Sequence, residues 1–374
     1  MRLTLVISSL SSGGAERVMS TLANAWSGKG WDVTILTTHD GGRAPDYALE
    51  PGVKVESVDP RRGGLGRQIE IVKRIRRQVK FNSPDVVVSF LNYTNILALI
   101  ATRGLGVPVI VSERLDPSIV DIGPLWSRLR RWTYRWTDAL VAQTPTAAQR
   151  FEPMAPRRVR VAPNPVFGLS TDPGADDPVT FDRPTFLAVG RLHPQKGFDV
   201  LIRAMAQVHG LESAWQLIIL GEGDSRAELE QIIEASELGD TIRLQGRVLN
   251  PWPWLKAADV FVLSSHSEGF PNALCEAMAA GLPVVSTDCP SGPADLITDG
   301  EDGLLVPVDD ADALAEHMLQ LARSQELRTR LGARAEQIRN RYRLAAILDL
   351  WDEIIAEVIG TTPPTSSTSS DHIE

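Results

Sequence analysis

Residues 258–288 read ADVFVLSSHSEGFPNALCEAMAAGLPVVSTD, and this stretch predicts the fold class. Its apolar beginning, Ala258 to Ser265, is typical of a buried strand. The segment NALCEAMAAG predicts a helix that ends at Gly281, because glycine commonly follows the last helical turn. The apolar run LPVVST then predicts a second strand. A strand, a helix and a strand in close succession indicate a parallel sheet with helical crossovers.

The same alternation fills the rest of the chain in two series. The first half contains the apolar runs LTLVIS, WDVTILT, DVVVSFL and PVIVSE, separated by segments of helical period. After a Pro-, Gly- and Asp-rich passage at residues 164–178, the series restarts with TFLAVG, WQLIILG, TIRLQG and DVFVLSS. We therefore predict an α/β fold of two doubly wound, Rossmann-like domains that face each other across a ligand-binding cleft. The predicted segments are a first domain (1–165), a second domain (166–345), a helix that packs back toward the first domain (346–360) and a disordered tail (361–374).

The composition fits a protein of a reducing compartment. The chain has 374 residues, 43% of them hydrophobic, which is enough for two cores. Its two cysteines, Cys275 and Cys289, are spaced unlike metal ligands and predict no structural disulfide. No apolar run approaches the roughly 20 residues that a membrane-spanning helix needs. We expect a cytoplasmic protein whose contact with membranes, if it has one, is peripheral.

Charge is distributed unevenly between the two halves. Residues 1–180 contain 23 Lys and Arg against 17 Asp and Glu, whereas residues 181–374 contain 15 against 30. A basic first half favours polyanions or anionic lipid surfaces as partners. The strongly acidic second half argues against nucleic acid as a partner of the whole chain.

Two carboxylates flank the start of the predicted helix within residues 258–288. Glu268 lies in the turn after the strand, beside Gly269, and the free N–H groups of the helix can hold a phosphate there. Glu276 lies about one turn inside the helix, where an acid can accept hydrogen bonds from two ribose hydroxyls. The alternative is that Glu268 complements the helix dipole and Glu276 is a solvated helix residue.

Two further turns between a strand and a helix carry groups that suit a diphosphate. In LAVGRLHPQKGFDVLIRAM, Arg191 and Lys196 lie in one turn and can clamp a diphosphate, or they are ordinary surface cations. In ISSLSSGGAERVM, Gly13 and Gly14 precede a helix, so their backbone either meets an anion or simply forms a tight turn. This turn is not the GxGxxG pattern, which lowers the case for a nicotinamide cofactor.

These three clusters, in this order, resemble the retaining glycosyltransferases of family 4, which have the GT-B fold. The resemblance spans about Met1 to Gly360, and its most specific part is EGFPNALCE followed by GLPVVSTDCPSGPADLITDGEDGLLVPVDD. It implies that Glu276 binds the ribose of a nucleotide-sugar donor, that Glu268 binds the donor sugar, and that Arg191 and Lys196 act on the diphosphate. It also implies catalytic roles for Glu268, Arg191 and Lys196. The other donor-binding residues that it implies are Gly13, Gly14, Arg247, Val248, Gly269, Phe270 and Leu274.

The resemblance implies no metal and no cofactor, because the cationic pair can neutralise the departing nucleotide diphosphate. Asp310 and Asp312 have DxD spacing, but VDDADALAEHM predicts a helix cap. Many family members carry a histidine where this chain has Glu113 and Arg114, in VIVSERLDPS. Arg114 is therefore assigned to donor or acceptor contact, and no general base is assigned.

Two helices of the first half carry basic residues beside apolar ones. In GRQIEIVKRIRRQVK, we expect Ile69, Val72, Ile75 and Val79 to pack inward. The basic residues Lys73, Arg76, Arg77 and Lys80 would meet a lipid diphosphate or anionic headgroups, or form a solvated face. In PLWSRLRRWTYRWTDAL a helical face of Leu125, Leu129, Trp132 and Trp136 opposes Arg128, Arg131 and Arg135; it suits a membrane interface, unless Trp132 and Trp136 lie in the core.

The first domain also resembles the subgroup that adds N-acetylhexosamine to polyprenyl-diphosphate-linked sugars. Asn92 and Asn95 then line the acceptor site, or they cap the helix that starts near Thr94. The predicted function is transfer of a sugar, with N-acetylhexosamine from a UDP-sugar as the favoured donor, to a lipid-linked saccharide in bacterial cell-surface glycan assembly. The predicted location is the inner face of the cell membrane. The alternatives are a GDP-mannose or UDP-hexose transferase, a UDP-sugar 2-epimerase and a non-catalytic nucleotide-sugar-binding module.

Overall fold

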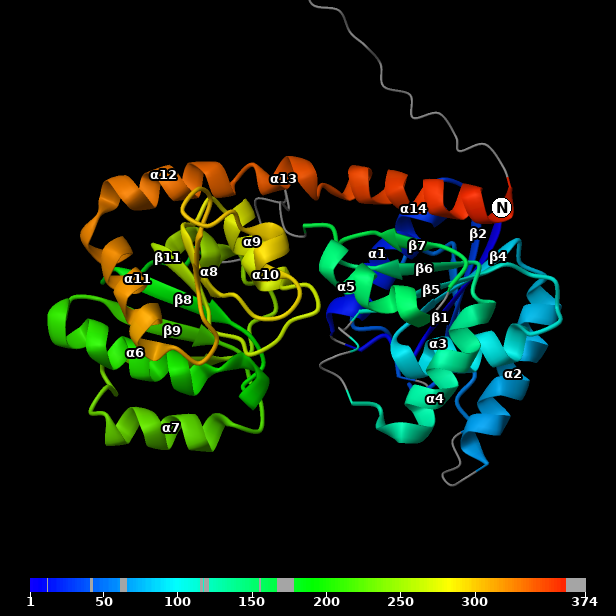
Figure 1. Ribbon diagram of the computed structural model, residues 1–374, viewed down its shortest axis with the longest axis horizontal. Helices are drawn as coiled ribbons and strands as arrows, with labels where there is room; N and C mark the ends of the chain where they lie inside the picture. Colours follow the sequence, from blue (N-terminus) through cyan, green and yellow to red (C-terminus); the bar gives the residue numbers. More distant parts are fainter. Residues whose placement is uncertain are drawn as a thin grey trace, which may run out of the picture. The chain divides into compact units, whose positions relative to one another are not determined.

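The chain forms two compact units, each built on its own parallel sheet (Figure 1). The computed structural model describes residues 1–11, 13–40, 43–60, 66–114, 117, 121–154, 156–166 and 178–360. The first unit comprises Met1–Pro165 and the chain from Leu344 onward, and the second comprises Val166–Arg343. The predicted tail, 361–374, lies outside the described residues.

The first unit contains seven parallel strands in the order β3-β2-β1-β4-β5-β6-β7. The central strands β4, β5 and β6 are buried along their whole length and β1 is buried except at Arg2, as expected for a parallel sheet covered on both faces. The strands are β1 (Arg2–Ile7), β2 (Asp32–Thr37), β3 (Val53–Ser57), β4 (Val86–Phe90), β5 (Val109–Ser112), β6 (Ala139–Ala142) and β7 (Val159–Val161).

Helices cover both faces of this first sheet. One face packs against α2 (Arg67–Asn82), α3 (Asn92–Thr102) and α5 (Pro145–Phe151), and α4 (Gly123–Thr133) packs against α3. On the other face, Trp26 of α1 (Gly14–Gly28) packs edge-on against Trp351 of α14 (Leu344–Ile359), and Trp351 stacks on Phe90 of β4. Asp352 of α14 accepts hydrogen bonds from Trp26 Nε1 and Lys29 Nζ. The last helix thus completes the core of the first unit.

The second unit repeats this plan with six parallel strands in the order β10-β9-β8-β11-β12-β13. One face packs against α6 (Phe198–Leu211), α7 (Arg226–Ala235) and α11 (Ala311–Arg323), while α9 (Asn272–Ala279) contacts β11 and β12 from the other face (Figure 1). The strands are β8 (Thr185–Val189), β9 (Gln216–Leu220), β10 (Ile242–Gly246), β11 (Val260–Leu263), β12 (Val284–Thr287) and β13 (Leu304–Val306). The remaining helices are α8 (Trp252–Ala257), α10 (Pro293–Leu296), α12 (Gln325–Ala335) and α13 (Ile338–Arg341).

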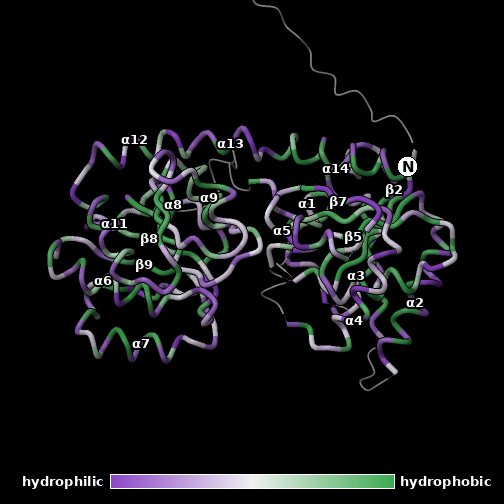
Figure 2. Tube along the Cα trace, viewed as in Figure 1, coloured by the Kyte–Doolittle hydropathy of each residue, from purple (hydrophilic) through white to green (hydrophobic). Residues whose placement is uncertain are grey.

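Figure 2 shows the apolar strands of both sheets and the alternating polar and apolar residues of the outer helix α7. The predicted α/β class with two doubly wound domains is confirmed. In each unit the strand order reverses once, between β1 and β4 in the first and between β8 and β11 in the second. Open α/β sheets bind ligands outside the carboxyl ends of the strands at such a reversal. No helix within the described ranges is long and apolar enough to cross a membrane.

Two details of the predicted basic helices differ from the structure. In α2 the buried positions are Ile71, Ile75 and Val79, spaced four residues apart, and Ile69 is 61% exposed. The prediction for Ile69 is wrong because it lies two residues, about 200° of helical turn, from Ile71. The helix expected over PLWSRLRRWTYRWTDAL ends at Thr133, and a 3₁₀ turn, η1 (Tyr134–Trp136), leads into β6.

Candidate active site

A salt bridge joins the two turns that follow β8 and β11, at the reversal of strand order in the second unit. Lys196 Nζ lies 2.6 Å from Glu268 Oε1. Lys196 ends the 3₁₀ turn η3 (Pro194–Lys196) after β8, and Glu268 follows β11. Because parallel strands end on the same side of the sheet, the two predicted clusters meet there. The structure thus brings together residues that lie 72 positions apart in the sequence.

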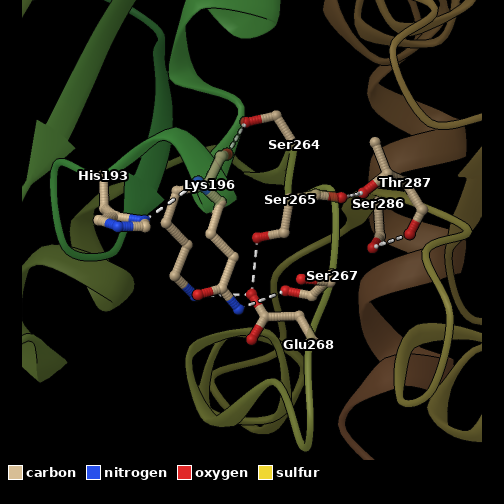
Figure 3. A network of polar contacts seen from close by, with 9 residues as sticks. His193, Lys196, Ser264, Ser265, Ser267, Glu268, Ser286 and Thr287 are labelled. Atoms are coloured by element: carbon tan, nitrogen blue, oxygen red, sulfur yellow. Dashed lines mark hydrogen bonds and ion pairs between the residues drawn. The ribbon is translucent and has the colours of Figure 1, made fainter. Parts of the chain in front are cut away.

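A hydrogen-bond network fixes both partners of this salt bridge (Figure 3). The hydroxyl of Ser265 donates to Glu268 Oε1 over 2.6 Å, and the hydroxyl of Ser264 donates to the Lys196 carbonyl over 2.8 Å. Gln195 Nε2 donates to the Ser267 carbonyl over 2.9 Å. These bonds cross-link the two turns, so the charged groups are held before any ligand binds.

Gly197 allows this close approach of the two turns. Its φ of 58° lies in the left-handed region, which residues other than glycine rarely adopt. A Cβ on Gly197 would also collide with the Ser264 carbonyl oxygen and crowd the His266 ring. The glycine after Lys196 is therefore required both by its backbone conformation and by the neighbouring turn.

The network leaves several polar groups available to a ligand. Glu268 Oε1 is shared by Lys196 and Ser265, but Oε2 has no hydrogen-bond partner in the described part of the chain. Arg191 is exposed, and no described residue pairs with its guanidinium. A free carboxylate oxygen suits a sugar hydroxyl, and exposed cations suit a diphosphate. The turn after β11 supplies the carboxylate oxygen, and the turn after β8 supplies the cations.

The helix after Glu268 carries the second predicted carboxylate. Glu276 is 5% exposed in α9, so the alternative of a solvated helix residue is wrong. Phe270 and Leu274 are also buried, and Phe270 packs edge-on against Tyr342. The segment that carries both glutamates is therefore part of the core of the second unit.

Arg247 and Val248 directly follow β10, at the same carboxyl end of the sheet. Arg247 is exposed and Val248 is half-buried. Two strands, β9 and β8, separate β10 from β11 in the sheet. Arg247 and Val248 thus lie at the same edge of the sheet as the salt bridge, the edge formed by the carboxyl ends of the strands.

In the first unit, the predicted glycine turn already meets an anion of its own chain. Gly13 precedes α1, and Gly14 is its first residue. A Cβ on Gly13 would collide with Glu16 Oε2, so the Glu16 carboxylate lies at the start of this helix. Burial raises the pKa of Glu16, and a hydrogen bond from its own backbone opposes that effect. A phosphate that uses Gly13 or Gly14 must compete with this side chain.

Arg114 is buried rather than displayed. Its guanidinium lies 3.8 Å from the centre of the Phe90 ring and 5.9 Å from that of Trp351, and Nη1 donates to Asn164 Oδ1 over 2.7 Å. Within the described ranges its Nε and Nη2 are buried without a hydrogen-bond partner. Burial lowers the pKa of Arg114 to about 9. Its predicted contact with donor or acceptor stays a prediction.

Glu113, which precedes Arg114, is also buried, and its hydrogen-bond partners are neutral. Its carboxylate accepts a hydrogen bond from the Tyr134 hydroxyl, and Tyr134 also lies 3.4 Å from Asn95 Nδ2. Burial raises the pKa of Glu113 to about 7, although the Tyr134 bond and the charge of Arg130 oppose that shift. Asn95 is fully buried and donates to the Ser112 carbonyl over 3.0 Å. It holds the interior of the first unit and does not line a surface.

The predicted basic residues of α2 divide into two kinds. Lys73, Arg77 and Lys80 are exposed, whereas Arg76 Nη1 donates to the carbonyls of Ala101 and Arg103 over 2.8 Å each. Arg76 therefore binds the end of α3, and its predicted role at an acceptor or membrane stays a prediction. In and after α4, Leu125, Arg128, Arg131, Trp132 and Arg135 are exposed. Trp132 is 54% exposed, so its placement in the core is wrong.

No group of three or more His, Cys, Asp or Glu that could hold a metal occurs among the described residues. Asp310 accepts a hydrogen bond from the Ala313 amide over 2.8 Å at the start of α11. The prediction that the DxD spacing marks a helix cap is confirmed. Both cysteines are free and buried.

Sequence reasoning missed several neighbours of the salt bridge. Ser264, Ser265 and Gln195 carry its hydrogen bonds, and Thr287 donates to the Ser265 carbonyl over 2.6 Å. Cys289 lies close enough that Glu268 contributes to raising the pKa of its thiol to about 12, after the larger effect of burial. The signal for the serines was present, since both directly follow a buried strand.

Family models match both units. Residues 177–338 match glycosyl transferases group 1, and residues 13–166 match the glycosyl transferase 4-like domain. A similar curated protein is the GalNAc-alpha-(1->4)-GalNAc-alpha-(1->3)-diNAcBac-PP-undecaprenol alpha-1,4-N-acetyl-D-galactosaminyltransferase of Campylobacter jejuni. It is 31% identical over 369 residues, which cover 96% of this chain and 99% of the relative. The lipopolysaccharide core biosynthesis glycosyltransferase LpsE of Rhizobium meliloti is 29% identical, covering 92% and 96%.

Solved structures share the fold at low sequence identity. Sucrose-phosphate synthase from Thermosynechococcus elongatus has a TM-score of 0.82 at 18% identity, covering 96% of this chain and 99% of that one. Anabaena HepE in complex with UDP has a TM-score of 0.80 at 18% identity, covering 96% and 100%. The chain belongs to the group 1 glycosyl transferases with a glycosyl transferase 4-like first domain, and the predicted GT-B fold is confirmed.

Proposed function

We propose that this glycosyltransferase moves an N-acetylhexosamine from a UDP-sugar to a lipid-linked saccharide, with retention of anomeric configuration and without a metal. The observation that carries the proposal is the Lys196–Glu268 salt bridge at the strand-order reversal of the second unit. Its acid and its cation match the two ends of a sugar diphosphate. The N-acetylgalactosaminyltransferase of Campylobacter jejuni named above, whose name includes a lipid-linked saccharide, supports the choice of substrates.

The donor diphosphate binds Lys196 and Arg191 in this proposal. Negative charge grows on the leaving diphosphate as the bond to the sugar breaks, and fixed cations stabilise that charge. Lys196 retains N–H donors beyond the one directed at Glu268. Because these cations supply the neutralising charge, the reaction needs no metal ion.

Glu268 and Glu276 bind the two sugars of the donor. Glu268 Oε2 accepts a hydrogen bond from a hydroxyl of the transferred sugar, while Oε1 keeps its hydrogen bonds from Lys196 and Ser265. Glu276 accepts hydrogen bonds from the ribose hydroxyls, and Arg247 and Val248 lie against the base. A ligand that binds these groups in the folded state and not in the unfolded chain stabilises the second unit.

A hexose donor is the alternative that a specific observation favours. Anabaena HepE was solved with UDP and glucose, and the LpsE relative belongs to lipopolysaccharide core biosynthesis. A UDP-hexose carries the same diphosphate and sugar hydroxyls, so Lys196 and Glu268 would bind it in the same way. A GDP-mannose donor differs in its base and in its sugar, and it carries the same diphosphate.

The exposed residues of α2 and α4 are the proposed contact with an anionic membrane. Lys73, Arg77 and Lys80 lie on α2, and each basic residue near such a surface contributes about 1 kcal/mol. Leu125 and Trp132 on α4 add exposed apolar side chains that suit the headgroup region. This surface would keep the enzyme at the inner face of the cell membrane, near a lipid-linked acceptor.

Thermal unfolding with a panel of nucleotide sugars, in the presence and absence of a chelator, tests the donor and the metal. We expect UDP-N-acetylhexosamine to raise the Tm most, and the chelator to change neither this shift nor UDP release with an undecaprenyl-diphosphate-linked saccharide. Loss of UDP release with chelator would contradict metal independence. Interconversion of UDP-sugars without an acceptor would indicate the epimerase instead.

Sedimentation with vesicles of anionic phospholipid tests the membrane contact. The variant Lys73→Ala/Lys80→Ala should bind these vesicles several-fold more weakly. The matched control is Lys256→Ala/Arg330→Ala, which removes two exposed charges from the second unit and should bind normally. Equal binding by both variants would rule out the proposed surface.

A further inference from the structure

The turn after β13 brings a second charged pair to the carboxyl end of the second sheet. Asp309 Oδ1 lies 3.0 Å from Nε2 of His266. Asp309 follows β13, and His266 follows β11, two residues before Glu268. Strand β12 lies between β11 and β13, so the ends of these two strands are roughly 10 Å apart. The pair therefore joins the Glu268 turn to a third turn, beyond the two that the Lys196–Glu268 salt bridge connects.

His266 also contacts the turn that carries Lys196. Its backbone amide donates to the Gln195 carbonyl over 2.9 Å. A Cβ placed on Gly197 would lie 2.9 Å from both Cδ2 and Nε2 of the ring, so this ring edge packs against the glycine. Gln195 and Gly197 are the two neighbours of Lys196 in the chain. His266 thus contacts the backbone on both sides of the lysine.

The same ring edge contacts Asp309. Nε2 is buried and makes no hydrogen bond of good geometry with any described residue, so its contact with Asp309 is electrostatic. The Asp309 side chain is 64% exposed and that of His266 is 36% exposed. A partly exposed pair of this kind adds little to overall stability. Its effect is on the orientation of the ring, which contacts both the carboxylate and Gly197.

Asp309 has a backbone conformation that residues other than glycine rarely adopt. Its φ is 64°, in the left-handed region. Stability alone would favour glycine at this position, because glycine has no Cβ to be strained there. Strain of this kind is concentrated at functional sites. Aspartate is less stable than glycine in this conformation, but it supplies the carboxylate that contacts His266.

Other charged groups near this pair already have partners. Lys196 and Glu268 pair with each other over 2.6 Å. Asp310, next to Asp309, accepts a hydrogen bond from the first turn of α11. Among the described acids, Asp309 is the one within 4 Å of a His266 ring nitrogen. The orientation of this imidazole therefore depends on Asp309.

We propose that His266 and Asp309 are positioning residues that fix the Lys196 turn for the transfer reaction. The inference rests on the proposed role of Lys196 at the donor diphosphate. Asp309 holds the imidazole against Gly197, and the ring and amide of His266 keep Lys196 where the charge of the leaving group develops. Neither residue contacts the donor in this assignment. Because a small displacement of a group that acts on the reacting atoms lowers the rate strongly, the pair affects turnover more than stability.

The test compares Asp309→Gly with Glu237→Gly. Glu237 is exposed after α7 and has φ 56°, so both changes relieve the same kind of backbone strain. Both variants should have a Tm that is higher than that of wild type or lower by no more than about 3 °C. With UDP-N-acetylgalactosamine and an undecaprenyl-diphosphate-linked saccharide, Asp309→Gly should lower kcat about five- to tenfold and leave the acceptor KM unchanged. Glu237→Gly should match wild type in both constants.

Further variants test whether Asp309 acts through the ring. His266→Ala should lower kcat as Asp309→Gly does. His266→Gln should recover part of the loss, because the glutamine amide can place a nitrogen near the position of Nε2. In the double variant His266→Ala/Asp309→Gly, the second change should have almost no further effect on kcat. Independent, multiplying effects in the double variant would show that Asp309 does not act through His266.

Binding of UDP separates this inference from the proposed substrates. Saturating UDP should raise the Tm less in Asp309→Gly than in Glu237→Gly, because Lys196 then meets the diphosphate in a less favourable position. This measurement needs no acceptor, so it decides the matter if no acceptor leads to UDP release, a result that would refute the proposed substrates. Equal kcat values in Asp309→Gly and Glu237→Gly would overturn the positioning role, as would equal shifts in Tm where no turnover is detected.

Discussion

At the carboxyl end of the second sheet, Lys196 and Glu268 form a salt bridge that is partly exposed; at the same end of the first sheet, Glu113 and Arg114 are buried and bond neutral partners. The two sheets have the same strand-order plan, yet they treat charge differently. In the second unit, opposite charges balance each other and remain within reach of a ligand. In the first unit, burial shifts the pKa of Glu113 up and that of Arg114 down, toward their neutral forms.

This difference indicates that the two units use their charged residues in different ways. A charged leaving group needs cations that are held in place but still accessible, as Lys196 is. In the first unit, neutral hydrogen-bond partners hold Glu113 and Arg114 in the interior. The same fold plan thus places charged residues in two different environments because different side chains occupy the strand ends.

The largest effect should come from removing the cation of the salt bridge. Lys196→Ala should lower the rate of UDP release by about 10²- to 10³-fold, since loss of one group that stabilises transition-state charge costs roughly 3–4 kcal/mol. Lys256→Ala, an exposed lysine of the same unit, should leave the rate unchanged. Steady-state assays of UDP release measure both. A Lys196→Ala rate within twofold of wild type would remove the catalytic role of this residue.

The close approach of the two turns can be tested through stability. Gly197→Ala should lower the free energy of unfolding by about 2 kcal/mol or more, because it adds a Cβ at positive φ against the Ser264 carbonyl. Gly210→Ala in α6 is the matched control, since a Cβ there meets nothing within 4 Å. The control should be neutral or slightly stabilising, by up to about 1 kcal/mol. Urea unfolding measures the free energy of unfolding of both variants. An equal loss in the two would contradict this account.

Burial of Glu113 predicts a pH dependence of stability opposite in sign to that of an acid whose pKa falls on folding. Its pKa rises from 4.5 to about 7 on folding, so between these values the folded state holds a proton that the unfolded chain releases. Glu113 therefore lowers the free energy of unfolding as the pH rises from about 4.5 to 7, with a total on the order of 1–3 kcal/mol. Glu113→Gln should remove this part of the dependence.

The measurement for Glu113 is urea unfolding of wild type and Glu113→Gln from pH 4.5 to 8. As the pH rises, the free energy of unfolding of Glu113→Gln should increase relative to that of wild type. Comparison of the two proteins cancels the other titrating groups. A difference that stays constant with pH would show that Glu113 does not titrate in this range.

The smallest effect separates the basic residues of α2. Arg76→Ala should lower the free energy of unfolding by about 1 kcal/mol or slightly more, because it leaves the carbonyls of Ala101 and Arg103 without their donor. Lys73→Ala should change stability by less than about 0.5 kcal/mol, as is usual for an exposed site. Thermal unfolding at several pH values checks both. Equal effects would mean that Arg76 is as free as its neighbours.

The sequence predicted the residues of the site better than their environment. The spacing of Glu268 and Glu276 and the turn with Arg191 and Lys196 were recognisable, and the structure joins Lys196 to Glu268. Burial of Glu276 and Arg114 was not predicted, because a charged residue in a sequence gives no sign of what packs around it. Arg76 was grouped with Lys73 for the same reason. Ile69 was misplaced because two helical faces about 200° apart both contain apolar residues.

The sequence by itself determined the two parallel sheets, the order of their elements and the residues placed at the strand ends, because local periodicity and turn residues carry that information. Only the tertiary structure decided which charges meet, which are buried and which remain exposed. Lys196 and Glu268 are 72 positions apart, and only the pairing order of β8 and β11 brings their turns together. The charge state of Glu113 likewise depends on Tyr134 and Arg130, which reach it through packing of the first unit and not through neighbouring positions in the chain.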